Sequence, residues 1–341
     1  MRIAIDAHGG DFGLEPNIAG ALRAAKDFGV EIAFVGDEAE INAAVKRISP
    51  QTTRGVCVVP AKGVAGMGAE PVQEIKDKPE CSVMVCAGLI KEGKADAMVS
   101  AGNSGATMVA AFMTLGRIKG ISRPAIAVAL PTVKGLTLLV DAGANTDCKP
   151  LHLLHFALMG SIYMEQLTGI SRPSIGILSV GEEETKGNSL VKEAIPLLKS
   201  SGLNYAGPVE GRDIPFHKTD VVVCDGFTGN IALKLYEGAA KAVMQIIKDG
   251  VSKSIPASLG MLMAKPVFAG IKKTISPDKA GGAPLLGVNG AVIISHGRSG
   301  ESAVYNAVNA ARMIAAASVN EKIRAAAQRL AETCKAGEAV S

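Results

Sequence analysis

The chain has no tryptophan and few other aromatic residues, which leaves little for stacking on unpaired bases. Only 4% of its 341 residues are aromatic, and the formal net charge at pH 7 is +4. Proteins that bind single-stranded nucleic acid stack the bases on aromatic side chains along a basic groove. The composition therefore predicts that nucleic acid is not a partner.

The cysteines include no C-x-x-C pair, and the sequence has no long apolar run. Cys57 and Cys224 lie within apolar, strand-like segments, which predicts buried free thiols in a reducing compartment. No uncharged run approaches the ~20 apolar residues that cross a bilayer. No signal peptide precedes the strand expected from Arg2 onward, so we expect a cytoplasmic protein.

Standard motifs for cofactors and nucleophiles are also missing. Residues 102–105 (GNSG) do not form a G-x-S-x-G elbow, there is no P-loop, and residues 66–68 do not continue into a dinucleotide fingerprint. His152 and His155 share a helical spacing, but no glutamate or cysteine cluster accompanies them, which favours helix packing over metal binding. The sequence predicts no metal and no cofactor such as ATP or NAD.

Short apolar runs alternate with helical patterns from residue 1 to about residue 299. Such alternation predicts an α/β fold, a parallel-sheet, three-layer α/β/α sandwich with helices on both faces of the sheet. We expect one large domain over residues 1–317, followed by a C-terminal helix extension and tail over residues 318–341. Residues 63–81 are interpreted as a surface loop with about one helical turn, and the chain beyond Gly300 as one long closing helix.

Six of the apolar runs end on clusters of small or polar residues, at 8–11, 100–105, 141–145, 181–184, 225–230 and 295–297. The carboxyl ends of parallel strands meet at one edge of a sheet, where glycine N–H groups and helix starts can hold an anion. The clusters therefore predict a backbone-lined cradle for a small anion. The candidate substrate- and phosphate-binding residues are Asp6, Gly9, Gly10, Asp11, Ser100, Gly102, Asn103, Ser104, Gly105, Gly181, Glu183, Asp225, Thr228, Gly229 and His296.

Lys186 and Asn230 are the candidate catalytic residues. A lysine at the carboxyl edge of a strand can reach an anion that nearby N–H groups hold, whereas Glu182 and Glu184 need only complement a helix start. Asn230 precedes a helix expected over residues 231–247 and could cap that helix as well as contact substrate. No Ser-His or Cys-His pair is placed to generate a nucleophile, so attack of an anion such as inorganic phosphate on an activated acyl group suits these residues best.

Residues 251–280 form a basic, amphipathic pattern with five lysines and one acidic residue. Apolar residues recur at helical spacing on both sides of Pro266, which breaks the pattern. The segment therefore predicts a helical hairpin, whose apolar residues include Leu259, Leu262, Met263, Val267 and Phe268.

Taken together, these motifs resemble the PlsX family of phosphate acyltransferases of bacterial phospholipid synthesis over residues 1–317. The motifs lie, in order, at residues 6–11, 100–106, 141–150, 181–188, 210–214, 225–230 and 281–287. The resemblance implies a fold similar to isopropylmalate dehydrogenases and phosphate acetyltransferases. It also implies reversible transfer of a fatty acyl group from acyl carrier protein to inorganic phosphate, which forms acyl phosphate for glycerol-3-phosphate acyltransferase in phosphatidic acid synthesis.

The same resemblance implies that Lys186 and Asn230 lie in the active site and that the protein is a homodimer. It further implies that the 251–280 hairpin attaches reversibly and peripherally to an anionic membrane surface, although a dimer-interface hairpin is an equal alternative. His8, Ser104 and residues 69–82 depart from the family pattern around the expected pocket.

Other functions remain open on the sequence alone. A dehydrogenase that uses NAD could share such a fold, and nicotinamide absorbance with hydroxy acids would reveal it. A non-catalytic adaptor could use the hairpin to tether lipid-synthesis enzymes to a membrane; deleting the hairpin would abolish an adaptor but leave an enzyme active in solution. Coenzyme A is an alternative to acyl carrier protein as the acyl donor.

Overall fold

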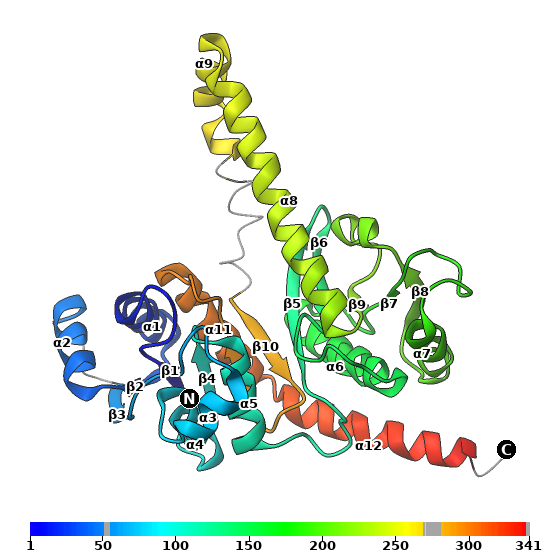
Figure 1. Cartoon of the computed structure of the whole chain (residues 1–341), viewed down its shortest axis with the longest axis horizontal. Coiled ribbons are helices and arrows are strands. Elements are labelled where there is room, and N and C mark those ends of the chain that lie inside the picture. The colour runs from blue at the N-terminus through cyan, green and yellow to red at the C-terminus, as the bar shows by residue number, and fades with distance from the viewer. Residues whose placement is uncertain (51–54, 269, 271–280, 339–341) are drawn as a thin grey trace.

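The strands of the computed structural model form one mixed, mostly parallel sheet (Figure 1). The structure describes residues 1–50, 55–268, 270 and 281–338, and within them the sheet has eleven strands in the order β3-β2-β1-β4-β11-β10-β5-β6-β9-β7-β8. The strands are β1 (Arg2–Asp6), β2 (Glu31–Gly36), β3 (Val56–Pro60), β4 (Ala97–Ser100), β5 (Ala125–Thr132), β6 (Gly135–Val140), β7 (Ile175–Leu178), β8 (Tyr205–Val209), β9 (Val221–Val223), β10 (Ala283–Leu286) and β11 (Ala291–Ile294).

Helices lie on both sides of this sheet, as the alternating pattern predicts. They are α1 (Leu14–Phe28), α2 (Glu38–Ile48), α3 (Pro71–Asp77), α4 (Ser82–Lys91), α5 (Ser104–Leu115), α6 (Pro150–Thr168), α7 (Ser189–Ser200), α8 (Gly226–Ser252), α9 (Ile255–Met263), α11 (Glu301–Ala316) and α12 (Val319–Glu338), with a 3₁₀ turn at Gly211–Phe216. In β1, Ile3 and Ile5 belong to one hydrophobic cluster and Ala4 to another. Because successive side chains of a strand point to opposite faces, the two clusters are the cores on the two sides of the sheet, and the expected layered α/β class is confirmed.

The two halves of the sheet run in opposite directions, which differs from a wholly parallel sheet. Strands β1, β4 and β11 are parallel to one another, and so are β6, β9 and β7. Between them, β10 pairs antiparallel with both β11 and β5, and β5 pairs antiparallel with β6. These three successive reversals leave the second half antiparallel to the first.

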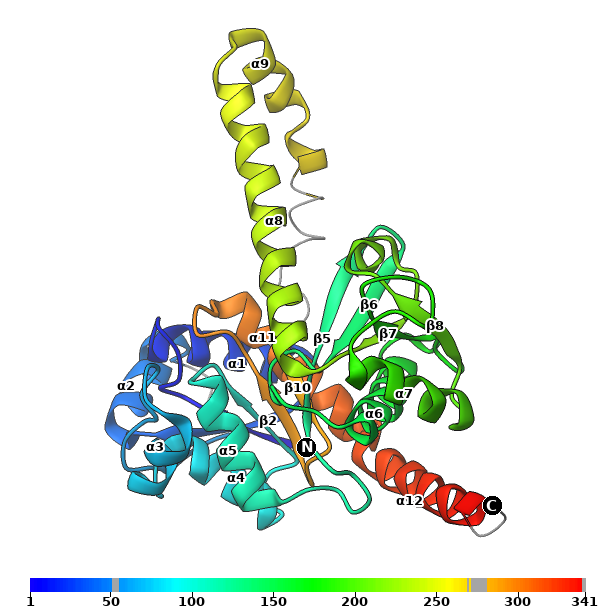
Figure 2. The same cartoon turned by 45° about the vertical axis from the view of Figure 1, so that its right-hand side comes forward.

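A long helical arm projects from the body of the molecule (Figures 1 and 2). Its first element, α8, begins at Gly226, and α9 follows at the tip. The expectation of a hairpin within residues 251–280 is therefore wrong about its start, because the ascending helix begins 25 residues earlier, directly after β9. Residues 271–280, the rest of the predicted hairpin, lie outside the described residues.

Several local expectations also need correction. The segment 63–81 contains the helix α3, which starts at Pro71 and is capped by Glu70. The chain beyond Gly300 forms two helices, α11 and α12, because Ser318 between them has a φ of 50°. Cys57 is exposed rather than buried, whereas Cys224 is buried.

No helix within the described ranges has both the length and the apolar character needed to cross a bilayer.

Candidate functional site

The loops after β1, β4 and β11 form one side of the candidate site, which we call the first rim (residues 6–11, 100–105 and 295–300). Asp6 is buried, and its carboxylate accepts hydrogen bonds from Ser82 Oγ at 2.6 Å and Ser100 Oγ at 2.7 Å. Burial raises the pKa of Asp6 above its usual value, although both hydrogen bonds oppose the shift. The carboxylate thus fastens the rim loop at Ser100 and the start of α4 at Ser82 to the end of β1 through two hydroxyl groups.

Ser100 connects this buried carboxylate to the glycine loops. Its Oγ accepts a hydrogen bond from Gly102 N at 3.1 Å and lies 3.2 Å from Thr107 Oγ1. A Cβ at Gly9 would lie 2.7 Å from both Gly102 N and Asp6 Oδ2, so only glycine allows the two loops to pack this closely. The structure therefore brings Asp6, Gly9, Ser100 and Gly102 together, but the Gly102 amide is occupied by Ser100 and is not available to an anion.

Asn103 and Asp11 fasten neighbouring loops to this rim. Asn103 caps α5, since its Oδ1 accepts from Ala106 N at 3.1 Å, while its Nδ2 donates to the carbonyl of Gly66 at 3.0 Å. The Asp11 amide donates to the Gly297 carbonyl at 2.7 Å. Asn103 therefore has a structural role that explains its identity without a ligand.

Some donors of the first rim remain open. In the part of the chain that the structure describes, no hydrogen bond uses the amides of Gly10, Ser104 or Gly105. Ser104 and Gly105 begin α5, where the first amides lack intrahelical partners and the dipole favours an anion. The cation nearest in sequence, Arg298, lies 3.8 Å from Asp11 Oδ2 and is paired with that carboxylate; the His296 ring accepts from Arg298 N at 3.1 Å.

The loops after β6, β7 and β9 form the other side, which we call the second rim (residues 141–145, 179–188 and 224–230). Its centre is Asp141, a buried carboxylate that accepts from the amides of Ile126, Gly143, Ala144 and Asn145 and from Asn145 Nδ2. The distances run from 2.7 to 3.2 Å. Burial raises the pKa of Asp141 against the effect of these donors. The N–H groups of the Asp141 loop are thus already hydrogen-bonded to the Asp141 carboxylate.

The start of α8 packs directly on this loop. Asp225 is the N-cap, since its carboxylate accepts from Thr228 N at 2.8 Å and Thr228 Oγ1 at 2.7 Å. A Cβ at Gly229 would lie 1.9 Å from the Asp141 carbonyl oxygen, so the helix can approach only with glycine there. The expectation that Asn230 caps the helix is wrong, because the helix already begins at Gly226.

Asn230 instead presents its side chain to the Asp141 loop from the first turns of α8. A Cβ built at Gly143 would lie 3.6 Å from both Cβ and Cγ of Asn230. No hydrogen bond within the described ranges holds the Asn230 amide. Its donor and acceptor are therefore available.

Lys186 lies on the neighbouring loop after β7. A Cβ at Gly181 would lie 3.2 Å from Lys186 Cγ and 3.0 Å from Glu183 Oε2, so both side chains lie over this glycine. Glu182 and Glu184 are engaged elsewhere, with Lys218 and Lys199 respectively, each at 2.6 Å. Among the described residues no carboxylate pairs with the Lys186 ammonium group, which leaves a free cation at this rim.

The two rims follow strands of opposite direction. Because β6, β7 and β9 run opposite to β1, β4 and β11, their carboxyl ends point to opposite edges. The structure therefore groups Lys186 and Asn230 with Gly181, Glu183, Asp225, Thr228 and Gly229, and groups the other candidates with Asp6. The expectation that all six clusters share one edge is wrong, because the reasoning assumed strands of a single direction.

Sequence reasoning missed Ser82 and underrated Asp141. Ser82 is 76 residues from Asp6 and sits at the start of a helix, so no local pattern connects the two. Asp141 follows a strand and precedes Gly143, a pattern that marks a loop but not the number of donors that converge on it. Ser295 is another residue that the sequence did not single out. Its Oγ is buried after β11 and has no hydrogen-bond partner in the described part of the chain.

The histidines of α6 have structural partners. His152 Nδ1 accepts from Lys149 N at 3.1 Å, and His155 Nδ1 accepts from Ser122 N at 3.2 Å. Burial lowers the pKa of His155 to about 4. No group of three or more His, Cys, Asp or Glu side chains in the described residues is arranged to hold a metal ion.

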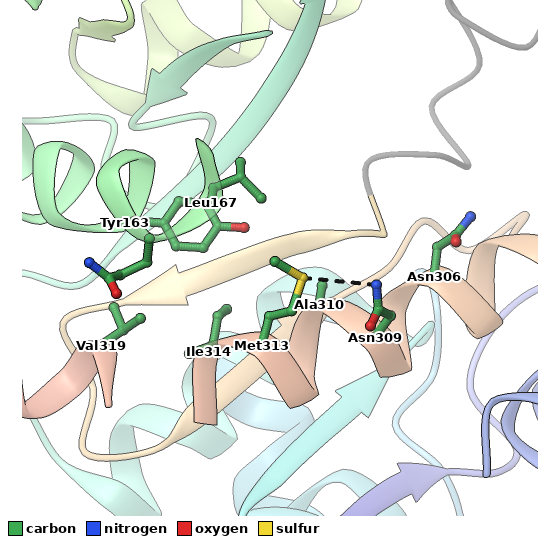
Figure 3. A pocket seen from close by; sticks show the side chains of 9 residues that line it. Tyr163, Leu167, Asn306, Asn309, Ala310, Met313, Ile314 and Val319 are labelled. Carbon is green, nitrogen blue, oxygen red and sulfur yellow. Dashed lines mark hydrogen bonds between the residues drawn. The ribbon is translucent and has the colours of Figure 1, made fainter. Parts of the chain in front are cut away.

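A small cavity of about 170 Å³ lies apart from both rims, between α6 and the helices α11 and α12 (Figure 3). Its lining includes Tyr163 and Leu167 from α6, Asn309 and Met313 from α11, and Val319 from α12. None of the candidate site residues lines it.

Comparisons with known proteins agree with this fold. Residues 1–322 match the model of a family described as fatty acid synthesis protein. A phosphate acyltransferase of Elusimicrobium minutum is 56% identical over 314 residues, which cover 92% of each chain. Another, of Desulfitobacterium hafniense, is 46% identical over 327 residues, which cover 95% of this chain and 97% of the relative.

Among solved structures, a phosphotransacetylase from Streptococcus pyogenes superposes with a TM-score of 0.61 at 18% identity, and covers 92% of this chain and 94% of that one. At this identity the likeness concerns the fold alone.

Proposed function

This chain belongs to the fatty acid synthesis protein family, and on that premise we propose that it transfers an acyl group to inorganic phosphate. The full-length similarity to proteins named phosphate acyltransferase supports this reaction. We further propose that the donor is an acyl group on acyl carrier protein and that the acyl phosphate serves glycerol-3-phosphate acyltransferase in phosphatidic acid synthesis.

The reaction needs positioning and charge stabilisation more than a protein nucleophile. An oxygen of hydrogen phosphate attacks the thioester carbonyl carbon, the tetrahedral intermediate collapses, and the carbon–sulfur bond breaks. The proton that phosphate carried goes to the leaving thiolate, so the products are acyl phosphate and free thiol. Negative charge develops on the carbonyl oxygen during attack, where preorganised donors are most effective.

The observation that carries the proposal is the pair of free polar groups at the second rim. The Lys186 ammonium group is unpaired among the described residues although three glutamates adjoin it in sequence. The Asn230 amide lies over Gly143 on the neighbouring loop. In this mechanism Lys186 holds phosphate and the developing oxyanion, and Asn230 Nδ2 orients the thioester carbonyl.

Trapping of acyl phosphate with hydroxylamine tests the activity directly. The protein is supplied with an acyl thioester of acyl carrier protein and with phosphate, and hydroxamate is measured. The same assay with acyl coenzyme A identifies the preferred donor. If wild-type protein forms no hydroxamate with either thioester, the proposed reaction is refuted.

A pair of lysine-loop variants tests the assignment of the residues. Lys186→Ala should lower kcat on the order of 100-fold, the typical cost of removing one oxyanion donor, with little change in thermal stability because the side chain is exposed. Glu184→Ala on the same loop removes only a surface ion pair with Lys199 and should leave kcat unchanged. Equal activity of the two variants would remove Lys186 from the mechanism.

We also propose that the arm formed by α8 and α9 contacts an anionic membrane surface. Met263 is 85% exposed, Leu262 is 66% exposed and Val267 is exposed as well, whereas Phe268 is partly buried; the side chain of Leu259 lies outside the described residues. Exposed apolar side chains accompanied by lysines, such as Lys253 and Lys265, suit reversible interfacial binding. Replacing Leu262 and Met263 by glutamate should abolish flotation with anionic vesicles and leave acyl transfer in solution intact.

A further inference from the structure

The cavity of about 170 Å³ between α6, α11 and α12 is lined by none of the residues that the proposed function uses. Helix α6 packs on β6 and β9, whereas α11 packs on β4 and β11, so the walls of the cavity come from both halves of the sheet. A dry cavity of about 150 Å³ accommodates a benzene molecule. The present cavity therefore has room for an apolar group of about six carbon atoms.

Tyr163 contributes a hydroxyl group without a partner to this cavity. The residue is only 6% exposed, and no hydrogen bond in the part of the chain that the structure describes uses its hydroxyl group. Burial raises the pKa of Tyr163 to about 12, so the phenol is neutral at pH 7 and can donate its proton. Figure 3 shows the side chain extending from α6 into the space above α11. Because buried polar groups are nearly always hydrogen-bonded, this hydroxyl group indicates an acceptor that enters the cavity.

Two carboxamide side chains of the lining are oriented by cations. Gln166 Oε1 accepts from Lys322 Nζ at 2.6 Å, and Asn309 Oδ1 accepts from Arg312 Nη2 at 3.0 Å. The NH₂ group of Asn309 has only the Met313 thioether, 3.9 Å away, as an acceptor (Figure 3). The NH₂ group of Gln166 has no acceptor within the described ranges. Each carboxamide thus keeps its oxygen on a cation and leaves its NH₂ group for a ligand.

The charges around the cavity favour an anion. None of the described residues that line it is acidic. Arg312 Cζ lies 5.3 Å from the centre of the Phe28 ring, and no carboxylate among the described residues pairs with Arg312 or Lys322. A carboxylate that accepts from N–H and O–H donors is stabilised further by positive charge behind those donors. The polar part of the cavity is therefore matched to a carboxylate.

The rest of the lining is apolar and includes Leu167, Ala310, Met313, Ile314 and Val319. We propose that this cavity binds a short-chain monocarboxylate of about six carbon atoms. Its carboxylate accepts from the Tyr163 hydroxyl group and from the NH₂ groups of Gln166 and Asn309, and its alkyl chain fills the apolar part. The bound molecule contacts both halves of the sheet and is not a substrate of acyl transfer, since no candidate catalytic residue lines the cavity.

Calorimetric titration of the full-length protein with hexanoate at pH 7 tests the site. We expect a dissociation constant on the order of 0.1 mM, which is usual for a ligand of about eight non-hydrogen atoms. From butanoate to hexanoate each added methylene group should tighten binding about fourfold, and the gain should end once the cavity is full. Hexanamide has the same length without the charge and should bind about tenfold more weakly. Absence of hexanoate binding, or equal binding of hexanamide, would overturn the proposal.

Tyr163→Phe and Tyr205→Phe form a matched pair, because each removes a buried hydroxyl group that has no partner in the described residues. Tyr205 lies on β8 and does not line the cavity. Tyr163→Phe should weaken hexanoate binding about tenfold or more, as expected for the loss of a hydrogen bond to a charged group. Its melting temperature should stay unchanged or rise, since the hydroxyl group has no protein partner to lose. Tyr205→Phe should bind hexanoate as wild type does, and equal affinities of the two variants would contradict the site.

Methyl labelling of the methionines shows where hexanoate binds. Met313 lines the cavity, whereas Met263 lies at the end of α9 on the arm. Hexanoate should shift the methyl resonance of Met313, which Met313→Leu assigns, and leave that of Met263 unchanged. Lys186→Ala should bind hexanoate with the affinity of wild type. If Lys186→Ala loses binding and Met313 does not respond, hexanoate occupies the acyl-transfer site and the proposal fails; because no turnover is measured, absence of acyl transfer would refute only the proposed function.

Discussion

The two buried carboxylates of the rims should respond in opposite ways to the same substitution. Asp6 accepts hydrogen bonds from the hydroxyl groups of Ser82 and Ser100, whereas every partner of Asp141 is an N–H group. A hydroxyl group can either donate or accept, but an N–H group can only donate. Asparagine, which replaces one carboxylate oxygen by an NH₂ group, should therefore suit position 6 and not position 141.

At position 6 both hydrogen bonds to the serine hydroxyl groups can be rebuilt. The asparagine oxygen would accept from Ser82, and its NH₂ group would donate to Ser100 Oγ. The Ser100 hydroxyl would turn to Thr107 Oγ1, 3.2 Å away, which itself donates to the Asn103 carbonyl. Asp6→Asn also removes a buried charge, so its free energy of unfolding at pH 7 should stay within about 1 kcal/mol of the wild-type value or exceed it.

At position 141 the network cannot be rebuilt. The NH₂ group would face at least two donors, the amide and the side-chain nitrogen of Asn145. Hydrogen bonds to a charged group contribute about 1.5–3 kcal/mol each, so two lost bonds predict a destabilisation of about 3 kcal/mol or more for Asp141→Asn. Both variants are measured by urea-induced unfolding followed by circular dichroism.

The pH dependence provides a second test of the Asp6 variant. Burial raises the pKa of Asp6, so the protonated carboxyl group favours the folded state below about pH 4, and this contribution is lost as the pH rises through the raised pKa. The stability of Asp6→Asn relative to wild type should therefore increase from pH 4 toward pH 8. Similar destabilisation of both variants at pH 7, or a difference that falls with pH, would refute the argument from donor direction.

Three further predictions concern packing, acid stability and thiol reactivity. Gly229→Ala should prevent the docking of α8, because its Cβ would lie 1.9 Å from a backbone oxygen. Gly238→Ala, which has open space around it in the same helix, should instead raise the free energy of unfolding by about 0.5–1 kcal/mol. Thermal melts compare the two variants. Burial lowers the pKa of His155 to about 4, so about 3 kcal/mol of stability should be lost as the pH falls from 6.5 to 4. His155→Asn keeps an acceptor for the Ser122 amide and should lack that loss. Denaturant titrations at the two pH values measure the difference. Iodoacetamide should label the exposed Cys57 well before the buried Cys224, as read by peptide mass mapping; equal rates would contradict the burial of Cys224.

Much of the fold could be predicted because its determinants are local. Period-two and helical patterns of apolar residues located most of the strands beside the rims and the helices that follow them, since burial on one face leaves its mark in nearby residues. The starts of helices were less certain. At α8 the cap is Asp225 and not Asn230, because several polar residues in succession can each cap a helix and only the packing of Gly229 on the Asp141 loop selects one of them.

The candidate site also has a part that the sequence could predict and a part that it could not. Its glycines and its two free polar side chains were predictable, because a lysine or an asparagine at the end of a strand is visible in the sequence. The hydroxyl of Ser82 on Asp6 and the five donors on Asp141 were not, because these groups come from distant segments or from backbone whose direction depends on the folded loop.

By itself, the amino-acid sequence determined the layered α/β fold class, the order of the helices and strands and the chemical character of each loop, because these depend on neighbours along the chain. Only the tertiary structure decided which loops share an edge. Strand direction across β10 and β5 is set by pairing between segments more than 140 residues apart, and no local pattern records whether such a pair runs parallel or antiparallel. The three reversals place Lys186 and Asn230 after strands that run opposite to the strands of the first rim.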